Sequence, residues 1–141
     1  MPVEIARVGT DAVESFVRKT EREALKSLYD FSVIWHEQRY AFAALDAEEM
    51  VGVAEIRVAA SLAHVERVIV VPPRRRQGIG RALLDGAAET ASYYNCHKMS
   101  ALVPHGGAAQ QFLERCGYCE EAVLPQHTFK LDVAVLRKFL L

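Results

Sequence analysis

Cysteine is scarce in this chain of 141 residues, and so are long apolar runs and any excess of one charge. The three cysteines, Cys96, Cys116 and Cys119, are odd in number and too few for a disulfide framework. Cys116 and Cys119 have CxxC spacing, but no second pair completes a four-ligand zinc site. The first thiol also lies where a helix is expected to end, the wrong pole for stabilising a thiolate. We therefore predict no metal site, treat the spacing as coincidental and leave the role of the two thiols open.

The net charge is −1 at pH 7, so no overall field recruits nucleic acid or an anionic membrane, and any attraction for anions must be local. No apolar run approaches the roughly 20 residues that span a bilayer. The N-terminal sequence MPVEIARVGTDAV contains acidic residues and lacks a basic region followed by an apolar one, so we expect no signal peptide. These absences predict a cytoplasmic protein without a membrane or nucleic-acid partner.

The composition is that of a globular protein, with 51% hydrophobic and 25% charged residues. A chain of 141 residues can bury a substantial core and is too short for two typical domains. We find no internal repeat, low-complexity tract or linker. The sequence therefore predicts one domain over residues 1–141.

Apolar periodicity predicts a mixed sheet with helices on its faces, an α/β or α+β architecture. The expected strands cover residues 3–8, 39–46, 50–59, 62–71, 98–103 and 128–133. The expected helices cover a segment capped by Thr10 or Asp11 and residues 21–29, 78–94 and 108–116. Residues 30–39 fit a loop or a short helix. The C-terminal AVLRKFLL fits a strand extension or a short helix, and could pair with a second subunit in a homodimer.

The segment VVPPRRRQGIGRALL, residues 70–84, joins an expected strand to an expected helix. A Walker loop needs Lys-Ser or Lys-Thr after its glycines, and neither follows here. A dinucleotide fingerprint needs glycine or alanine at the position of Leu83. Nucleic-acid binding would rest on the single basic triplet Arg74–Arg76, with no interleaved aromatic residues. These three interpretations fit the segment poorly.

A phosphate site fits the segment better. Backbone N–H groups in the first turn of a helix lack intrahelical partners, and the helix dipole adds about half a positive charge there. Gly78 and Gly80 have no side chains, so a pyrophosphate could approach the backbone closely. Arg75, Arg76 and Arg81 could add charge-assisted hydrogen bonds. A tight turn with solvated arginines is the alternative.

The spacing Val70-x-Pro72-x-x-Arg75-x-x-Gly78-x-Gly80-x-x-Leu83-Leu84 closely resembles the central motif of the GNAT N-acetyltransferase superfamily. The later segment SALVPHGGAAQQFLERCGY resembles that family's next strand, helix and closing Gly-aromatic pair. The likeness covers nearly the whole chain and is weakest before residue 38. It implies a mixed, mostly antiparallel sheet flanked by helices, with a splay between two central parallel strands, residues 62–71 and 98–103.

The resemblance also implies a reaction, the direct transfer of an acetyl group from acetyl-CoA, as co-substrate, to an amine. Backbone groups of Val68, Ile69 and Val70 match the positions that bind pantetheine and polarise the thioester. The segment that matches the pyrophosphate loop comprises Arg75, Arg76, Gln77, Gly78, Ile79, Gly80 and Arg81. The acceptor is an amine on a small molecule or a peptide, and polyamine, amino acid, antibiotic and protein N-terminus all stay open.

An ammonium group must lose a proton before it can attack, and in several family members a Glu or His on the splayed strand removes it. His64 takes that position here, and Glu66 follows two residues on, on the same face by the period of two. A solvent-facing His64 without a catalytic role is the alternative.

Two positions depart from the family's pattern. Leu113 stands where the family often has the Tyr that protonates the departing thiolate, and Gly106 stands where it often has Asn. Tyr118, Cys116, His105 or water could replace that acid, and the sequence selects none of them. The departures also favour a second function, a non-catalytic acetyl-CoA-binding sensor or interaction domain.

Overall fold

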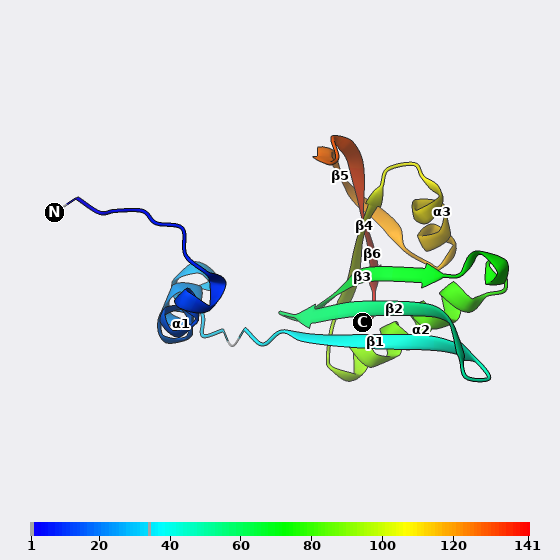
Figure 1. Ribbon diagram of the computed structural model, residues 1–141, viewed down its shortest axis with the longest axis horizontal. Coiled ribbons are helices and arrows are strands. Elements are labelled where there is room, and N and C mark those ends of the chain that lie inside the picture. Colours follow the sequence, from blue (N-terminus) through cyan, green and yellow to red (C-terminus); the bar gives the residue numbers. More distant parts are fainter. Residues whose placement is uncertain (1, 34) are drawn as a thin grey trace. The chain divides into compact units, whose positions relative to one another are not determined.

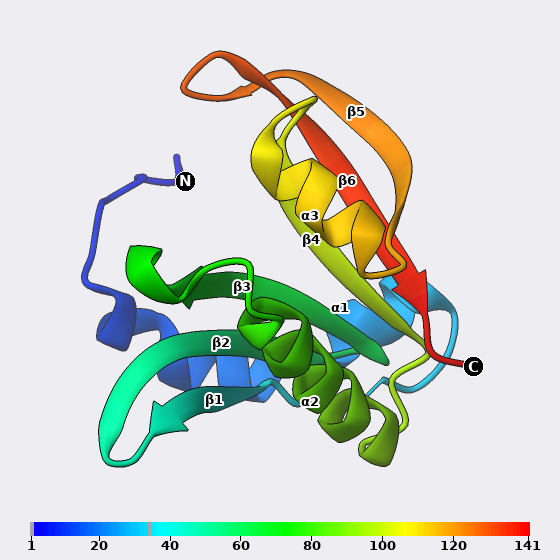
Figure 2. The ribbon, with the colours of Figure 1, turned by 90° about the vertical axis from the view of Figure 1, so that its right-hand side faces the viewer.

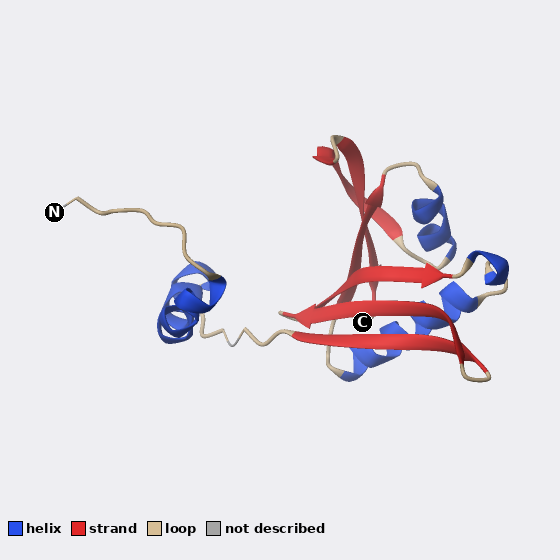
Figure 3. Ribbon diagram, in the orientation of Figure 1, coloured by secondary structure: helices blue, strands red, loops and turns tan. Residues whose placement is uncertain are grey.

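The computed structural model describes residues 2–33 and 35–141. The chain divides into two compact units, Met1–Trp35 and His36–Leu141, and each is described by itself. Figure 1 shows the elements in chain order, and Figure 3 shows them coloured by type. The expectation of one domain over residues 1–141 stays a prediction.

The first unit is helical. A 3-10 turn, η1 (Thr10–Val13), leads into one helix, α1 (Glu14–Tyr29), where the sequence predicted two. The linking residues Arg18 to Glu21 contain no glycine or proline, so nothing breaks the helix between its two apolar halves. The predicted strand 3–8 is wrong, because residues 2–9 form no regular secondary structure (Figure 3). Alternating side chains supply the pattern of a strand but not the neighbouring strand that its backbone needs.

The second unit is built on one six-stranded sheet in the order β1-β2-β3-β4-β6-β5. Its strands are β1 (Gln38–Asp46), β2 (Glu49–Ala59), β3 (Leu62–Val70), β4 (Lys98–Pro104), β5 (Cys119–Thr128) and β6 (Leu131–Phe139). All neighbours pair antiparallel except the central β3 and β4, which are parallel. This mixed, mostly antiparallel sheet with helices confirms the predicted fold class.

The C-terminal strands differ from the prediction. Residues 128–133 are not one strand, because β5 ends at Thr128 and β6 begins at Leu131 after a tight turn. The sequence did not predict β5, because β5 is an edge strand whose side chains are mostly exposed and show no alternation of buried and exposed positions. The terminal AVLRKFLL belongs largely to β6, which lies between β4 and β5, so strands of its own chain pair with both of its edges.

Two helices pack on the same side of this sheet, toward the viewer in Figure 2. α2 (Ile79–Tyr93) contacts β1, β2 and β3, and α3 (Ala108–Arg115) contacts β4, β5 and β6. The side chains that α2 buries, Leu83, Leu84, Ala87 and Ala91, lie on one stripe of the helix. In the described part of the chain, no helix is both long and apolar enough to cross a membrane.

The end of α3 is fixed by two backbone hydrogen bonds of the Schellman type. The N–H of Tyr118 donates to the carbonyl of Leu113 at 3.0 Å, and that of Gly117 to Glu114 at 3.1 Å. Cys116 therefore lies at the C-terminal end of a helix, as the sequence predicted.

Candidate active site

β3 and β4 pair over only three residues before they separate. The pairs are Leu62 with Lys98, Ala63 with Met99 and His64 with Ser100. Beyond His64 the two strands diverge, as Figure 2 shows, so the predicted splay is present. His64 thus occupies the apex of the gap between them.

Beyond His64, the edge of β3 that faces the gap is not paired with β4. The N–H of Val71 donates to the carbonyl of Val51 on β2 at 3.0 Å. Because backbone groups alternate between the two edges of a strand, those of Val68 and Val70 face the gap, and those of Ile69 face β2. Two of the three residues predicted to bind pantetheine through their backbone therefore present it to the gap.

A cavity of about 900 Å³ opens at this edge, between α2 and α3. Its lining residues are Val68, Val70, Arg74, Arg75, Arg76, Gly78, Ile79, Gly80, Arg81, Ala108, Phe112, Arg115 and Cys116. All the predicted cofactor-binding residues except Ile69 and Gln77 are among them. The sequence did not predict the α3 wall residues Ala108, Phe112 and Arg115, and it offered the fourth, Cys116, only as a candidate acid. The spacing of Ala108, Phe112 and Arg115, four and three residues apart, marks one helix face and was the available signal.

Gly78 and Gly80 are required by the structure for different reasons. Gly78 is the N-cap of α2 with a φ of +81°, a conformation that glycine adopts without strain. A Cβ at Gly80 would lie 2.8 Å from Cζ of the Phe112 ring. Gly80 therefore admits an aromatic ring from α3, in addition to leaving the backbone open. No side chain caps the N-terminus of α2, and its first turn contains no acidic residue.

Protein acceptors hold two of the cavity arginines. Arg74 forms an ion pair from Nη1 to Oδ2 of Asp46 at 2.7 Å, and its Nε donates to Oε1 of Gln77 at 3.1 Å. These contacts tie the end of β1 to the phosphate-loop segment. The Nε of Arg75 donates to the carbonyl of Val70 at 3.0 Å. Gln77 thus supports the loop from outside the cavity.

Arg81 links the two helices. Its guanidinium donates to the backbone carbonyl of Arg115, the last residue of α3. A cation at the C-terminal end of a helix is favourable because the dipole is negative there. Arg81 therefore serves both as part of the cavity wall and as a link between α2 and α3.

His64 lies on the opposite face of β3 from this cavity. Its neighbours Ala63 and Val65 are buried on the helix-covered face, so the alternation of the strand directs His64 to the other face. Burial lowers the pKa of His64 below its usual 6.5; Glu66 raises this pKa and Arg57 lowers it. Within the described residues, no hydrogen bond involves its imidazole. His64 is therefore a neutral imidazole at pH 7, with a ring nitrogen free to accept a proton.

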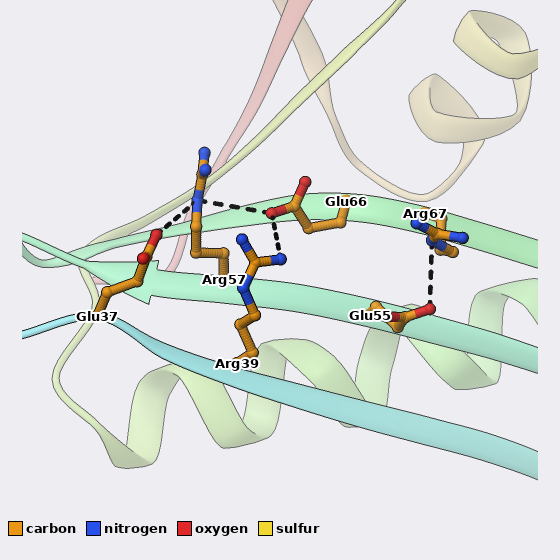
Figure 4. A network of polar contacts seen from close by, with 6 residues as sticks. All are labelled: Glu37, Arg39, Glu55, Arg57, Glu66 and Arg67. Carbon is orange, nitrogen blue, oxygen red and sulfur yellow. Dashed lines mark hydrogen bonds and ion pairs between the residues drawn. The ribbon is translucent and has the colours of Figure 1, made fainter. Parts of the chain in front are cut away.

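Glu66 lies on the same face as His64, where two arginines surround it (Figure 4). Glu66 lies in a β-bulge: Val65 and Arg67 pair with successive residues of β2, and Glu66 between them has no partner. Its Oε1 lies 3.2 Å from Nη1 of Arg39 and 3.6 Å from Nε of Arg57, the cross-strand neighbour of His64. Arg57 also lies 3.4 Å from Oε1 of Glu37. Glu66 is thus the anionic partner of a charge network.

Tyr118, one candidate for the missing acid, is in the core. Its hydroxyl donates to Sδ of Met99 at 3.6 Å, and burial raises its pKa well above the usual value of 10. Leu113, at the position of the family's Tyr, is also buried in the core. Neither residue lines the cavity.

Of the other two candidates, only Cys116 lines the cavity. Nε2 of His105 lies 3.2 Å from Oε1 of Glu120, and His105 does not line the cavity. Burial raises the pKa of Cys116, so its thiol is protonated at neutral pH. Cys119 is exposed, and all three cysteines are free thiols. The described residues contain no group of three His, Cys, Asp or Glu side chains arranged to hold a metal ion.

Replacing Tyr118 by phenylalanine is expected to leave turnover within about threefold of the parent, because only one weak hydrogen bond to sulfur is lost. The measurement is the initial rate of free thiol release from acetyl-CoA with any amine that supports turnover. A loss of about 100-fold or more, with the melting temperature unchanged, would make Tyr118 a catalytic acid.

The family model described as "Acetyltransferase (GNAT) family" matches residues 8–118. The chain belongs to this family. The matched residues contain the splayed strands, the arginine-lined cavity and His64. A search among curated proteins finds no match.

Solved structures share the GNAT fold with this chain at low sequence identity. An acetyltransferase from Bacillus cereus has a TM-score of 0.74 at 15% identity, covering 96% of this chain and 97% of that one. The ribosomal-protein-S18-alanine N-acetyltransferase of Escherichia coli has a TM-score of 0.64 at 18% identity, with coverage of 96% and 92%. An acetyltransferase from Bacillus anthracis, in complex with acetyl coenzyme A, has a TM-score of 0.68 at 18% identity, covering 72% of this chain and 62% of that one. At these identities the likeness shows the fold alone.

Proposed function

We propose that this GNAT protein is an N-acetyltransferase that transfers the acetyl group of acetyl-CoA directly to an amine. The observation that carries the proposal is the continuity of the splay with the cavity. The unpaired edge of β3 leads from His64 at its apex to the uncapped N-terminus of α2 and its arginines. Acetyl-CoA would supply an activated acyl group as a thioester, together with phosphates that suit such a cationic site.

The chain's own residues would bind and polarise the co-substrate. The N–H groups at the start of α2, with Arg76, would hold the pyrophosphate, and the backbone of Val68 and Val70 would hold the pantetheine arm. An N–H of that edge would donate to the thioester carbonyl oxygen as negative charge develops there. One such donor contributes about 3 kcal/mol of barrier lowering in a dry site. Fixing the two reactants near each other contributes more.

His64 would remove the proton from the acceptor ammonium, directly or through a water molecule. It is neutral at pH 7, its imidazole is free, and it lies at the apex of the gap. We prefer it to Glu66 because the Glu66 carboxylate already forms ion pairs with Arg39 and Arg57. The new C–N bond forms as the C–S bond breaks, and the thiolate of CoA leaves with a proton from solvent.

The acceptor in this proposal is an amine on a small molecule or a peptide. The location in this proposal is cytoplasmic, with no nucleic-acid or membrane partner. The net charge of −1 supports the part about partners, because no overall positive field attracts nucleic acid or an anionic membrane. A homodimer stays a prediction from the apolar C-terminal segment alone.

A second function is favoured by one specific observation, the burial of both Leu113 and Tyr118. If no other group protonates the departing thiolate, the protein binds acetyl-CoA as a sensor or interaction domain and catalyses nothing. Release of free thiol with any amine of a diverse panel would reject this alternative, provided that the His64→Ala variant is slower.

Acetyl-CoA is expected to raise the melting temperature of the purified protein. A ligand at 100 times its Kd stabilises the folded state by about 2.7 kcal/mol. For a chain of this size, that corresponds to a shift of roughly 5–15 °C. Acetate at the same concentration and ionic strength is the matched control, because it has a carboxylate but neither phosphates nor pantetheine. No shift at millimolar acetyl-CoA would refute the proposal.

A further inference from the structure

The five arginines of the cavity wall fall into two groups by their hydrogen bonds. Arg74, Arg75 and Arg81 donate to protein acceptors, as described above. Within residues 2–33 and 35–141, the side chains of Arg76 and Arg115 make no hydrogen bond or ion pair. The first group therefore supports the wall, and the second group keeps all its donors for a ligand.

The two uncommitted arginines come from opposite walls. Arg76 belongs to the loop before α2 and has a left-handed backbone with a φ of +62°. Arg115 ends α3, and its carbonyl accepts the hydrogen bond from Arg81 that ties α3 to the first turn of α2. That bond fixes the backbone of Arg115 relative to the helix start where a pyrophosphate would lie. Two separate cationic positions thus face one cavity of about 900 Å³.

Two separate cations suit a ligand with two separate anionic groups. The wall near α3 is otherwise apolar, with Ala108, Phe112 and Cys116, so a second phosphate there would have few other donors. The C-terminal end of α3 carries the negative end of the helix dipole, which repels an anion. The positive charge of Arg115 at this end offsets that repulsion. A planar guanidinium binds phosphate through two parallel N–H donors.

We propose that Arg115 binds the 3′-phosphate of the CoA ribose, so that the protein selects 3′-phosphorylated CoA over its dephospho form. This inference rests on the proposed function, because it assigns a second phosphate of the same ligand. Arg76 serves the pyrophosphate, which both forms of the ligand share. The two arginines therefore have separable effects on affinity.

The test is calorimetric titration of CoA and 3′-dephospho-CoA into the full chain and its Arg115→Gln variant, at one ionic strength. The parent is expected to bind CoA about 5- to 20-fold more tightly than dephospho-CoA, the range for a partly exposed charge-assisted contact. The Arg115→Gln variant should bind dephospho-CoA as the parent does and lose the preference for CoA.

Two control variants separate this role from general electrostatics. Arg76→Gln should weaken both ligands by the same factor and keep the preference. Arg67→Gln removes an exposed arginine outside the cavity, one that pairs with Glu55 at 3.2 Å, and should change neither affinity. Melting curves without ligand show whether each variant is folded.

Equal affinity of the parent for both ligands, or a preference that survives Arg115→Gln, would overturn the inference and leave the proposed function standing. Failure of the parent to bind either ligand would instead overturn the proposed function, and the inference with it. A preference lost equally in Arg67→Gln would assign it to net charge and would also overturn the role of Arg115.

Discussion

Replacing Gly80 by glutamate is expected to abolish the stabilisation of the protein by acetyl-CoA. The new carboxylate would stand in the first turn of α2, within the cavity wall and next to the proposed pyrophosphate. Juxtaposed like charges cost several kcal/mol, so affinity should fall by about 100-fold or more. The measurement is the melting temperature as a function of acetyl-CoA concentration.

The structure adds a steric effect that the charge argument alone would miss. Any side chain at Gly80 meets the Phe112 ring at 2.8 Å, so Gly80→Ala should by itself destabilise the fold by about 1–3 kcal/mol. Gly80→Gln has nearly the size of Gly80→Glu without the charge, so comparing these two variants isolates the effect of the charge on binding. The Ala82→Glu variant places the same charge on α2 at an exposed residue outside the cavity wall, and should keep the shift. A full shift in Gly80→Glu would show that the phosphates bind elsewhere.

His64→Ala is expected to lower kcat/KM for amine acetylation by about 100- to 10,000-fold, the usual contribution of a positioned base. The variant should still bind acetyl-CoA, because His64 lies on the face opposite the cavity. Free thiol release measures turnover, and the thermal shift measures binding. Equal turnover in the variant and the parent would remove His64 from the mechanism.

The pH dependence follows from the protonation state of His64. A base must be neutral to accept a proton, so the rate falls as the pH drops through its pKa. Burial lowers that pKa, so the acid limb should lie below 6.5. Glu66→Gln removes the charge that raises the pKa and should move the limb to lower pH. Arg57→Gln should move it to higher pH. Limbs that stay in place in both variants would assign the titration to another group.

The β3–α2 region was predictable from sequence because its signals are local. Pro72 and Pro73 cannot continue a ladder, and the stripe from Leu83 to Ala91 has helical spacing. Those cues set the ends of β3 and α2 within one or two residues of the observed ones. The strand expected at residues 3–8 failed because its pattern was equally local but needed a partner.

The details of the site depend on residues distant in sequence, and no local pattern could show them. The ring that leaves no room for a side chain at Gly80 belongs to Phe112, which is on a different helix. Asp46 and the Arg115 carbonyl decide which arginines are committed to the protein. Residue types alone could predict a cationic phosphate site there, but not how its arginines divide the work.

The position of β6 has a consequence for how the two walls of the cavity come into existence. Residues 38–93 form β1, β2, β3 and α2 from neighbours in sequence, so the wall that contains the phosphate loop has short-range contacts that close quickly. β4 has only three pairs with β3 and obtains its long ladder from β6, the last strand in the order of synthesis. The α3 wall therefore cannot form completely until β6 pairs with β4 and β5. We expect the cavity to be completed late in folding, when its second wall closes on a first wall already in place.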